Sequence, residues 1–196
     1  ARTLKINYRT SHQIRRQADR LLDLKVSDVD GNEEDRSGTI SVFNGAAPAV
    51  EIFKSVELET QRVSQWVRDL VETGVKAEEI GVFVRSGNEI ARAEKAAELA
   101  GLKPNVLDET ARTRVGAVTV STMHLAKGLE FRFVAVIACD DEVIPSQQRI
   151  DEITDQADLE EVYNTERHLL YVACTRARDG LFVSGVDPES EFLNDL

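Results

Sequence analysis

Short runs of apolar residues alternate along the chain with longer segments in which apolar residues recur every three or four positions. The clearest short run is 80–85, with the sequence IGVFVR. An unbroken apolar run of this length is typical of a strand that is covered on both faces. Strands are therefore predicted at 39–43, 50–56, 80–85, 103–107, 118–122, 133–139 and 180–184.

The longer segments predict helices, because a spacing of three to four residues places apolar side chains on one helix face. Ser11 and Asn88 are predicted N-caps, and Gly74 is a predicted stop. The expected helices cover 10–22, 57–73, 88–101 and 157–178, with a short terminal helix after Pro188. The acidic, turn-rich segment 27–38 is expected to form a loop.

Strands that alternate with helices at these lengths predict an α/β fold with a parallel, doubly wound sheet flanked by helices. The 196 residues suit one domain. Sheets of this kind bind ligands beyond the carboxyl ends of their strands. We therefore expect the chemistry of the protein directly after the apolar runs.

The net charge of −11 argues against a module that binds nucleic acid through a broad basic surface, so any DNA contact must be local or shared with another domain. Cys139 and Cys174 lie in apolar stretches, which favours buried free thiols and a reducing, cytoplasmic setting. The chain contains no apolar run of membrane-spanning length and no signal-peptide pattern. Because it begins without Met and enters a motif at once, we interpret it as a fragment.

Three strings carry candidate chemistry. The first, 4–11 (LKINYRTS), places the flat ring of Tyr8 beside the guanidinium of Arg9, which suits a base and a phosphate. The second, 121–131 (STMHLAKGLEF), follows a predicted strand directly. Tyr8 and Arg9 taken alone fit a half-buried tyrosine beside a surface arginine better than a binding site.

In the second string, Gly128 permits a close approach of the backbone, and Glu130 has acceptors for a sugar hydroxyl. His124 taken alone is more often a structural histidine. The third string, 166–178 (ERHLLYVACTRAR), predicts a helix with Arg176 and Arg178 at its far end. A basic residue there also complements the helix dipole, which explains Arg178 but not the whole string.

Taken in order, the three strings resemble motifs IV, V and VI of superfamily 1 DNA helicases of the UvrD/Rep kind. Residues 80–104, a strand ending in Val-Arg and then a helix and AGLKP, resemble the middle segment of that family. The resemblance covers most of the chain apart from 27–38. It implies that 1–196 form the second, C-terminal RecA-like motor domain of an ATP-dependent DNA helicase with a role in DNA repair.

The resemblance also implies roles for individual residues. Tyr8 would stack on adenine, and Arg9 and Arg176 would reach the γ-phosphate as arginine fingers. Glu130 would hold the ribose, with Gly128 close to the nucleotide. The residues implied to contact single-stranded DNA are Thr122 and His124, with Arg85 and Asn88 as further contacts.

The chain departs from the family pattern in two ways: it lacks two motifs of an ATP site, and its segment before the second string is short. It has no G-x-x-x-x-G-K-[ST] phosphate loop and no DExx magnesium motif before Leu4. The resemblance therefore assigns most of the ATP site, with all Mg²⁺ ligands, to a first RecA-like domain of the full-length protein. The large helical subdomain of relatives is expected to be absent or reduced to a loop near 105–116.

Two alternatives remain open. The domain is compatible with a helicase remnant that acts as a protein-interaction or regulatory module, for which the acidic composition offers some support. A nuclease fused outside the chain is equally compatible. The presence of Tyr8, Arg9, Glu130 and Arg176 together favours the motor over the remnant, since a remnant has no need of all four.

Overall fold

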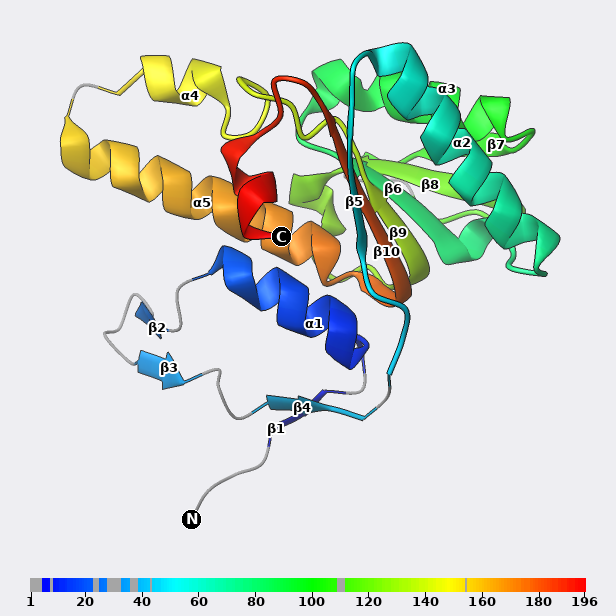
Figure 1. Ribbon diagram of the computed structural model, residues 1–196, viewed down its shortest axis with the longest axis horizontal. Coiled ribbons are helices and arrows are strands. Elements are labelled where there is room, and N and C mark those ends of the chain that lie inside the picture. The colour runs from blue at the N-terminus through cyan, green and yellow to red at the C-terminus, as the bar shows by residue number, and fades with distance from the viewer. Residues whose placement is uncertain are drawn as a thin grey trace.

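A computed structural model of the chain describes residues 5–7, 9–22, 25–27, 33–35, 39–42, 44–108, 112–153 and 155–196. Its centre is a six-stranded sheet in the order β5-β10-β9-β6-β8-β7 (Figure 1). All five neighbouring pairs are parallel. The strands are β5 (Ala49–Phe53), β6 (Ile80–Val84), β7 (Lys103–Val106), β8 (Ala117–Thr122), β9 (Phe131–Val136) and β10 (Ala177–Val186). The predicted parallel α/β fold is confirmed.

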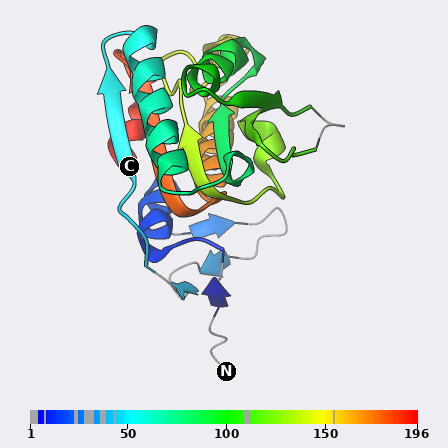
Figure 2. The ribbon, with the colours of Figure 1, turned by 90° about the vertical axis from the view of Figure 1, so that its right-hand side faces the viewer.

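Helices cover both faces of this sheet (Figures 1 and 2). One face packs against α2 (Val56–Glu72) and α3 (Ile90–Leu99), and the other against α1 (His12–Ala18) and α5 (Gln156–Cys174). On β6, Val82 and Val84 face the first layer whereas Phe83 faces the second. This alternation explains why the strand is apolar at every position, since successive side chains point into opposite cores.

The helix ends follow the local sequence closely. Ser11 Oγ accepts the Ile14 N–H at the start of α1, as predicted. Gly74 ends the α2 segment with a φ of +95°, a conformation that glycine adopts without strain. The prediction that Asn88 caps a helix is wrong. Ser86 caps the short helix η3 (Gly87–Glu89) with a capping box, and α3 follows directly.

Two other sequence predictions are corrected. The helix expected to reach residue 178 ends at Cys174, because β10 begins at Ala177 and pairs there with Phe131 of β9. Arg176 therefore lies in a turn, and Arg178 lies on a strand. The expected loop 27–38 contains parts of a short antiparallel pair, β2 (Lys25–Ser27) with β3 (Glu33–Asp35). The residues of β3 are all acidic and Val26 is the single apolar residue of β2, so these strands give no apolar signal in the sequence.

The remaining elements are short and lie around the main sheet. Near the N-terminus, β1 (Lys5–Asn7) pairs in parallel with β4 (Thr39–Ser41), below α1 in Figure 1. The others are α4 (Gln147–Asp151) and the 3-10 helices η1 (Asp19–Leu21), η2 (Ala77–Glu79), η4 (Met123–Ala126) and η5 (Glu191–Asp195). Between β7 and β8, residues 107–108 and 112–116 form neither helix nor strand.

A buried ionic network secures the carboxyl end of the sheet. Glu59 of α2 is fully buried and accepts the Ala138 N–H at 3.1 Å and the Ser184 hydroxyl at 2.7 Å. Arg92 of α3 pairs with Glu59 and, at 2.6 Å, with Asp140. Since a buried carboxylate is stable only when it is hydrogen-bonded and paired, the network fixes α2 and α3 to the ends of β9 and β10.

Candidate functional site

Arg9, Glu130 and Arg176 converge at the amino ends of β9 and β10. Glu130 immediately precedes β9, and Arg176 immediately precedes β10. The Phe131 N–H donates to the Arg176 carbonyl at 3.0 Å, which ties the two strand starts together. Arg9 Nε forms an ion pair with Glu130 Oε1. Residues from three distant parts of the sequence therefore form one cluster.

The guanidinium of Arg176 is oriented by its own turn. Its Nε donates to the Val172 carbonyl at 3.0 Å, and Nη1 and Nη2 lie 3.5 Å from Leu129 O and 3.4 Å from Thr175 Oγ1. Burial, followed by the positive charge of Arg9, lowers the pKa of Arg176, and Glu130 opposes the shift. Arginine nevertheless stays protonated. Two like charges brought together in this way favour an anion between them.

The segment that carries Arg9 is anchored to the third sequence string. Thr10 Oγ1 donates to the Thr175 carbonyl at 3.2 Å, and the Ser11 N–H donates to the Arg178 carbonyl at 3.1 Å. Arg9 is thus held beside the turn that carries Arg176. Tyr8, the predicted adenine-stacking residue, lies outside the described residues.

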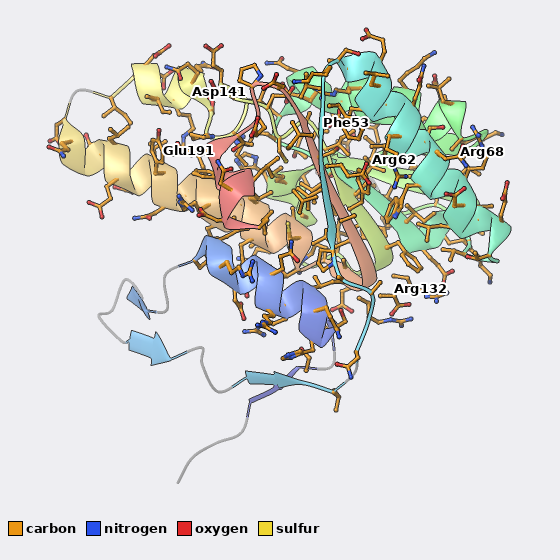
Figure 3. The ribbon with its side chains drawn as sticks, in the orientation of Figure 1. Phe53, Arg62, Arg68, Arg132, Asp141 and Glu191 are labelled. Carbon is orange, nitrogen blue, oxygen red and sulfur yellow. The ribbon has the colours of Figure 1, made fainter. Side chains whose placement is uncertain are left out.

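A cleft of about 260 Å³ opens beside this cluster. Its lining residues are Arg9, Glu78, Glu79, Glu130, Phe131, Arg132 and Arg178. Asp179 accepts from Arg132 at 2.7 Å and from Arg178 at 2.8 Å. Figure 3 shows Arg132 near the amino ends of the strands. Sequence reasoning missed Arg132 and Asp179, although a charged residue inside the apolar segment 131–136 was a usable signal.

Gly128 has the backbone conformation that glycine adopts without strain. Its φ of +86° is in the left-handed region, which explains glycine at this position. A Cβ built on Gly128 would meet no atom within 4 Å, so the space beside its backbone is open. Together with two arginines and an exposed carboxylate, this open backbone is compatible with a phosphorylated nucleotide.

The other predicted site residues lie at the opposite end of the sheet. Thr122 is the last residue of β8 and is half-buried, and His124 is exposed on η4. Arg85 directly follows β6, and Asn88 is exposed on η3. The expectation that all the chemistry lies at the carboxyl ends is therefore wrong for Arg9, Glu130 and Arg176. The string 121–131 spans from the carboxyl end of β8 to the amino end of β9, so its two halves reach opposite edges.

Arg85 differs from its exposed neighbours because its side chain is only 7% exposed. Its Nε and Nη2 donate to the two oxygens of Glu166 at 2.5 and 2.6 Å. Glu166 of α5 is fully buried and also accepts from Arg149 Nη1 at 2.9 Å. Burial alone would raise the pKa of Glu166, but the two guanidiniums outweigh it and lower that pKa.

His124 lies in the electrostatic field of these groups. Although His124 is exposed, its partial desolvation lowers its pKa from the ordinary value of 6.5; Arg85 and Arg149 add to the decrease, and Glu166 opposes it. A neutral imidazole offers one donor and one acceptor rather than a charge. Among the described residues, no group of three or more His, Cys, Asp or Glu side chains is placed to hold a metal ion. No helix within the described ranges is long and apolar enough to cross a membrane.

Comparisons with known proteins narrow the class of parallel α/β domain to which the chain is similar. Residues 94–187 match the sequence model of the UvrD-like helicase C-terminal domain. The C-terminal domain of a possible DNA helicase from Lactobacillus plantarum WCFS1 has a similar fold, with a TM-score of 0.64 and 21% identity over 95% of this chain and 92% of that one.

Several bacterial helicases are similar to the chain in sequence. ATP-dependent DNA helicase UvrD1 of Mycobacterium tuberculosis is 36% identical over 100 residues, which are 45% of this chain and 12% of that protein. DNA helicase II of Rickettsia typhi is 38% identical over 39% of this chain and 11% of its own length. ATP-dependent DNA helicase PcrA of Bacillus subtilis is 33% identical over 41% of this chain and 11% of its own length. The resemblance to UvrD-like helicases is confirmed, and the matches span about an eighth of the length of these relatives.

Proposed function

We propose that this chain is the second motor domain of an ATP-dependent superfamily 1 DNA helicase or translocase. The observation that carries the proposal is the convergence of Arg9, Glu130 and Arg176 at one edge of the sheet. A domain that only bound other proteins would have no need to bring two arginines and a carboxylate together beside an open glycine. A motor domain needs this arrangement, because its edge must complete an ATP site on a partner domain.

In this proposal the nucleotide binds between this edge and a first RecA-like domain of the same protein. Arg9 and Arg176 present planar guanidinium groups to the γ-phosphate and stabilise the charge that develops as the phosphoryl group is transferred. Glu130 accepts a hydrogen bond from the ribose, Gly128 lies beside the nucleotide, and Tyr8 stacks on the adenine. The partner domain supplies the phosphate loop and the ligands for Mg²⁺, which neutralises the phosphate oxygens.

The ion pair between Arg9 and Glu130 suggests how the site changes when ATP binds. Both side chains are about half-exposed, at 49% and 56%. An exposed pair of this kind contributes at most about 1 kcal/mol to stability. Breaking the ion pair therefore costs little free energy when ATP binds. Arg9 then binds the phosphate, and Glu130 accepts a hydrogen bond from a sugar hydroxyl.

The opposite edge is proposed to bind single-stranded DNA through Thr122 and His124, with Arg85 and Asn88 nearby. The string 121–131 connects this edge to the nucleotide edge, because it runs from the end of β8 to the start of β9. Closure of the domain on its partner would thus displace the DNA contacts relative to the partner. Repeated closure and reopening would move DNA stepwise.

The rival proposal is a regulatory or protein-interaction module, and the charge of −11 is the observation in its favour. The two proposals differ in their response to ATP and DNA. The 196-residue chain alone is expected to show no ATPase activity, because it has no phosphate loop. It is also expected to bind single-stranded DNA no more tightly than the ~10⁻⁴ to 10⁻⁶ M of non-specific contacts.

The decisive experiment measures DNA-stimulated ATP turnover in the whole protein that contains this chain. Arg176→Ala should lower kcat on the order of 10³-fold, and Arg176→Lys should restore little, because a point charge does not replace a planar fork. Arg68→Ala is the matched control and should leave kcat unchanged, because Arg68 lies on α2 and donates to the Leu99 carbonyl of α3, away from both edges (Figure 3). If Arg176→Ala turned over ATP at the normal rate, or if DNA did not stimulate ATP turnover by the wild type, the regulatory module would be favoured over the helicase motor.

A further inference from the structure

The cluster of Arg85, Arg149 and Glu166 is a basic site in an acidic protein. Both oxygens of Glu166 are engaged, by Arg85 from the end of β6 and by Arg149 from α4. The carboxylate is fully buried, whereas the side chain of Arg149 is 39% exposed. Two guanidiniums and one carboxylate leave one positive charge, and the part that reaches solvent is an arginine.

This site lies beside the predicted DNA edge. The positive charges of Arg85 and Arg149 both act on the imidazole of His124, and Glu166 opposes them, so the four groups form one local electrostatic unit. Glu166 is on α5, which packs in the same core as Met123 and Ala126 of η4, the residues that flank His124 on either side. A buried acid therefore positions the arginines next to an exposed histidine.

We propose that Arg149, positioned by Glu166, is an additional contact to the phosphodiester backbone of single-stranded DNA, next to His124. The proposal rests on the proposed function, and it adds a residue that none of the three sequence strings contains. Arg149 stands on α4, in the connection between β9 and α5. Its side chain is partly exposed, and a guanidinium carries five N–H groups, so Arg149 can donate to a phosphate oxygen while Nη1 stays bonded to Glu166.

The two acidic residues that follow Arg149 most closely have hydrogen-bond partners of their own. Gln147 donates to Asp151 at 2.7 Å, and Gln148 donates to Glu152 at 3.4 Å, which orients these carboxylates but leaves their charges in place. The negative charge of Glu166 is balanced by its two partners, since Arg85 and Arg149 both donate to its carboxylate. The position also suits a chain with a charge of −11, because a small site of this kind holds a strand without a broad basic face.

A salt titration of the whole protein with labelled oligothymidylate tests the proposal. Arg149→Gln should weaken binding about five- to tenfold at physiological salt, and it should reduce the slope of log affinity against log salt by about 0.7, the value for one phosphate contact on a single strand. Arg149→Lys keeps the charge and should retain the wild-type slope. Arg68→Gln removes the same charge from the α2 side of the molecule (Figure 3) and should change neither quantity.

The outcomes separate this inference from the function on which it rests. Arg149 is not a phosphate contact if Arg149→Gln shows the same dependence of affinity on salt as the wild type. The same conclusion follows if Arg149→Lys reduces the salt slope as much as Arg149→Gln does. If that happens while His124→Ala still weakens DNA-stimulated ATP turnover, the motor proposal stands without Arg149. If the wild-type protein neither binds the oligonucleotide nor responds to it in ATP turnover, both proposals are overturned. Melting temperatures of the variants show whether a loss reflects unfolding.

Discussion

Arg9 and Glu130, which lie far apart in the sequence, form an ion pair at the amino end of β9. Arg9 follows the first short strand, and Glu130 ends the string that begins at the carboxyl end of β8. The pair joins a residue proposed to contact the γ-phosphate with one proposed to contact the ribose. In this proposal the two side chains pair with each other when no nucleotide is bound, and both bind the nucleotide when it is present.

Replacement of Glu130 tests this relationship. Glu130→Gln should change the free energy of unfolding by less than about 1 kcal/mol, because the pair is exposed. It should raise KM for ATP with little effect on kcat, because a ribose contact is felt equally in the ground and transition states. Urea unfolding and steady-state ATP turnover measure the two effects. Glu160→Gln, on the exposed side of α5, serves as the control, and a large loss of stability in Glu130→Gln alone would contradict the assignment.

Tyr8 and Arg9 are neighbours with different proposed tasks. Tyr8→Ala should raise KM for ATP, because a stacking contact with the base contributes to binding throughout the reaction. Arg9→Ala should instead lower kcat by a large factor, as loss of an arginine finger does. Turnover measured over a range of ATP concentrations distinguishes the two patterns. Near-normal kcat in Arg9→Ala with abolished turnover in Tyr8→Ala would show that the roles are reversed.

Replacement of Glu166 is expected to destabilise the fold. Glu166→Gln leaves Arg85 buried without its carboxylate, and breaking a buried ion pair in this way costs about 3–5 kcal/mol. Glu161→Gln, an exposed change on the same helix, should cost less than about 0.5 kcal/mol. Urea unfolding at neutral pH compares the two. Equal stability of the two variants would mean that the cluster does not hold the fold together.

The same carboxylate predicts a response to acid. The folded state lowers the pKa of Glu166 below its ordinary value of 4.5, so its stabilising effect is complete above that value. The effect is lost as the pH falls from about 4.5 through the lower pKa of the folded protein, where protonation releases the two arginines. Wild type should lose stability more steeply than Glu166→Gln over this range. Parallel unfolding curves of wild type and variant would contradict this prediction.

The lowered pKa of His124 predicts that DNA affinity and folding stability both depend on pH. Because its pKa in the folded protein lies below 6.5, it is neutral at neutral pH and gains a positive charge only in more acidic solution than an ordinary histidine. DNA affinity should therefore rise as the pH falls below about 6.5. Folding stability should fall over the same window, since the unfolded chain binds the proton first.

The two trends are checked by measuring DNA affinity and the free energy of unfolding from about pH 7.5 to about pH 5, the range in which histidine titrates. His124→Gln should remove much of each trend. His12→Gln, at the exposed start of α1, should leave both unchanged and serves as the control. Identical pH profiles of the two variants would assign the response to another group.

The two cysteines should be inert in the folded chain. Burial raises the pKa of Cys174 to about 12 and raises that of Cys139 well above its ordinary value of 9.0, and both are free thiols. Since only the thiolate reacts rapidly with alkylating agents, neither should be labelled at pH 8 without denaturant. Both should react in urea. Rapid labelling of the native protein by iodoacetamide, followed by mass spectrometry, would contradict their burial.

Local pattern was sufficient to predict the sheet and most of its helices. The run 80–85 predicted a buried strand, and all five residues of β6 are fully enclosed. The helix limits at Ser11 and Gly74 were also predictable, since capping and a left-handed stop depend on neighbouring residues. The strings 121–131 and 166–178 indicated the helicase resemblance before any geometry was known.

Only the tertiary structure decided which of these residues act together. The sequence indicated Arg9, Glu130 and Arg176 as one group, but not that they lie at the amino edge while Thr122 and His124 lie at the carboxyl edge. The resemblance indicated Arg85 as a DNA contact, and the sequence gave no sign of Arg149, whereas both arginines share the buried Glu166. The physical reason is that burial periodicity is a property of neighbouring residues, whereas an ion pair depends on where a parallel sheet and its crossover connections bring distant segments together.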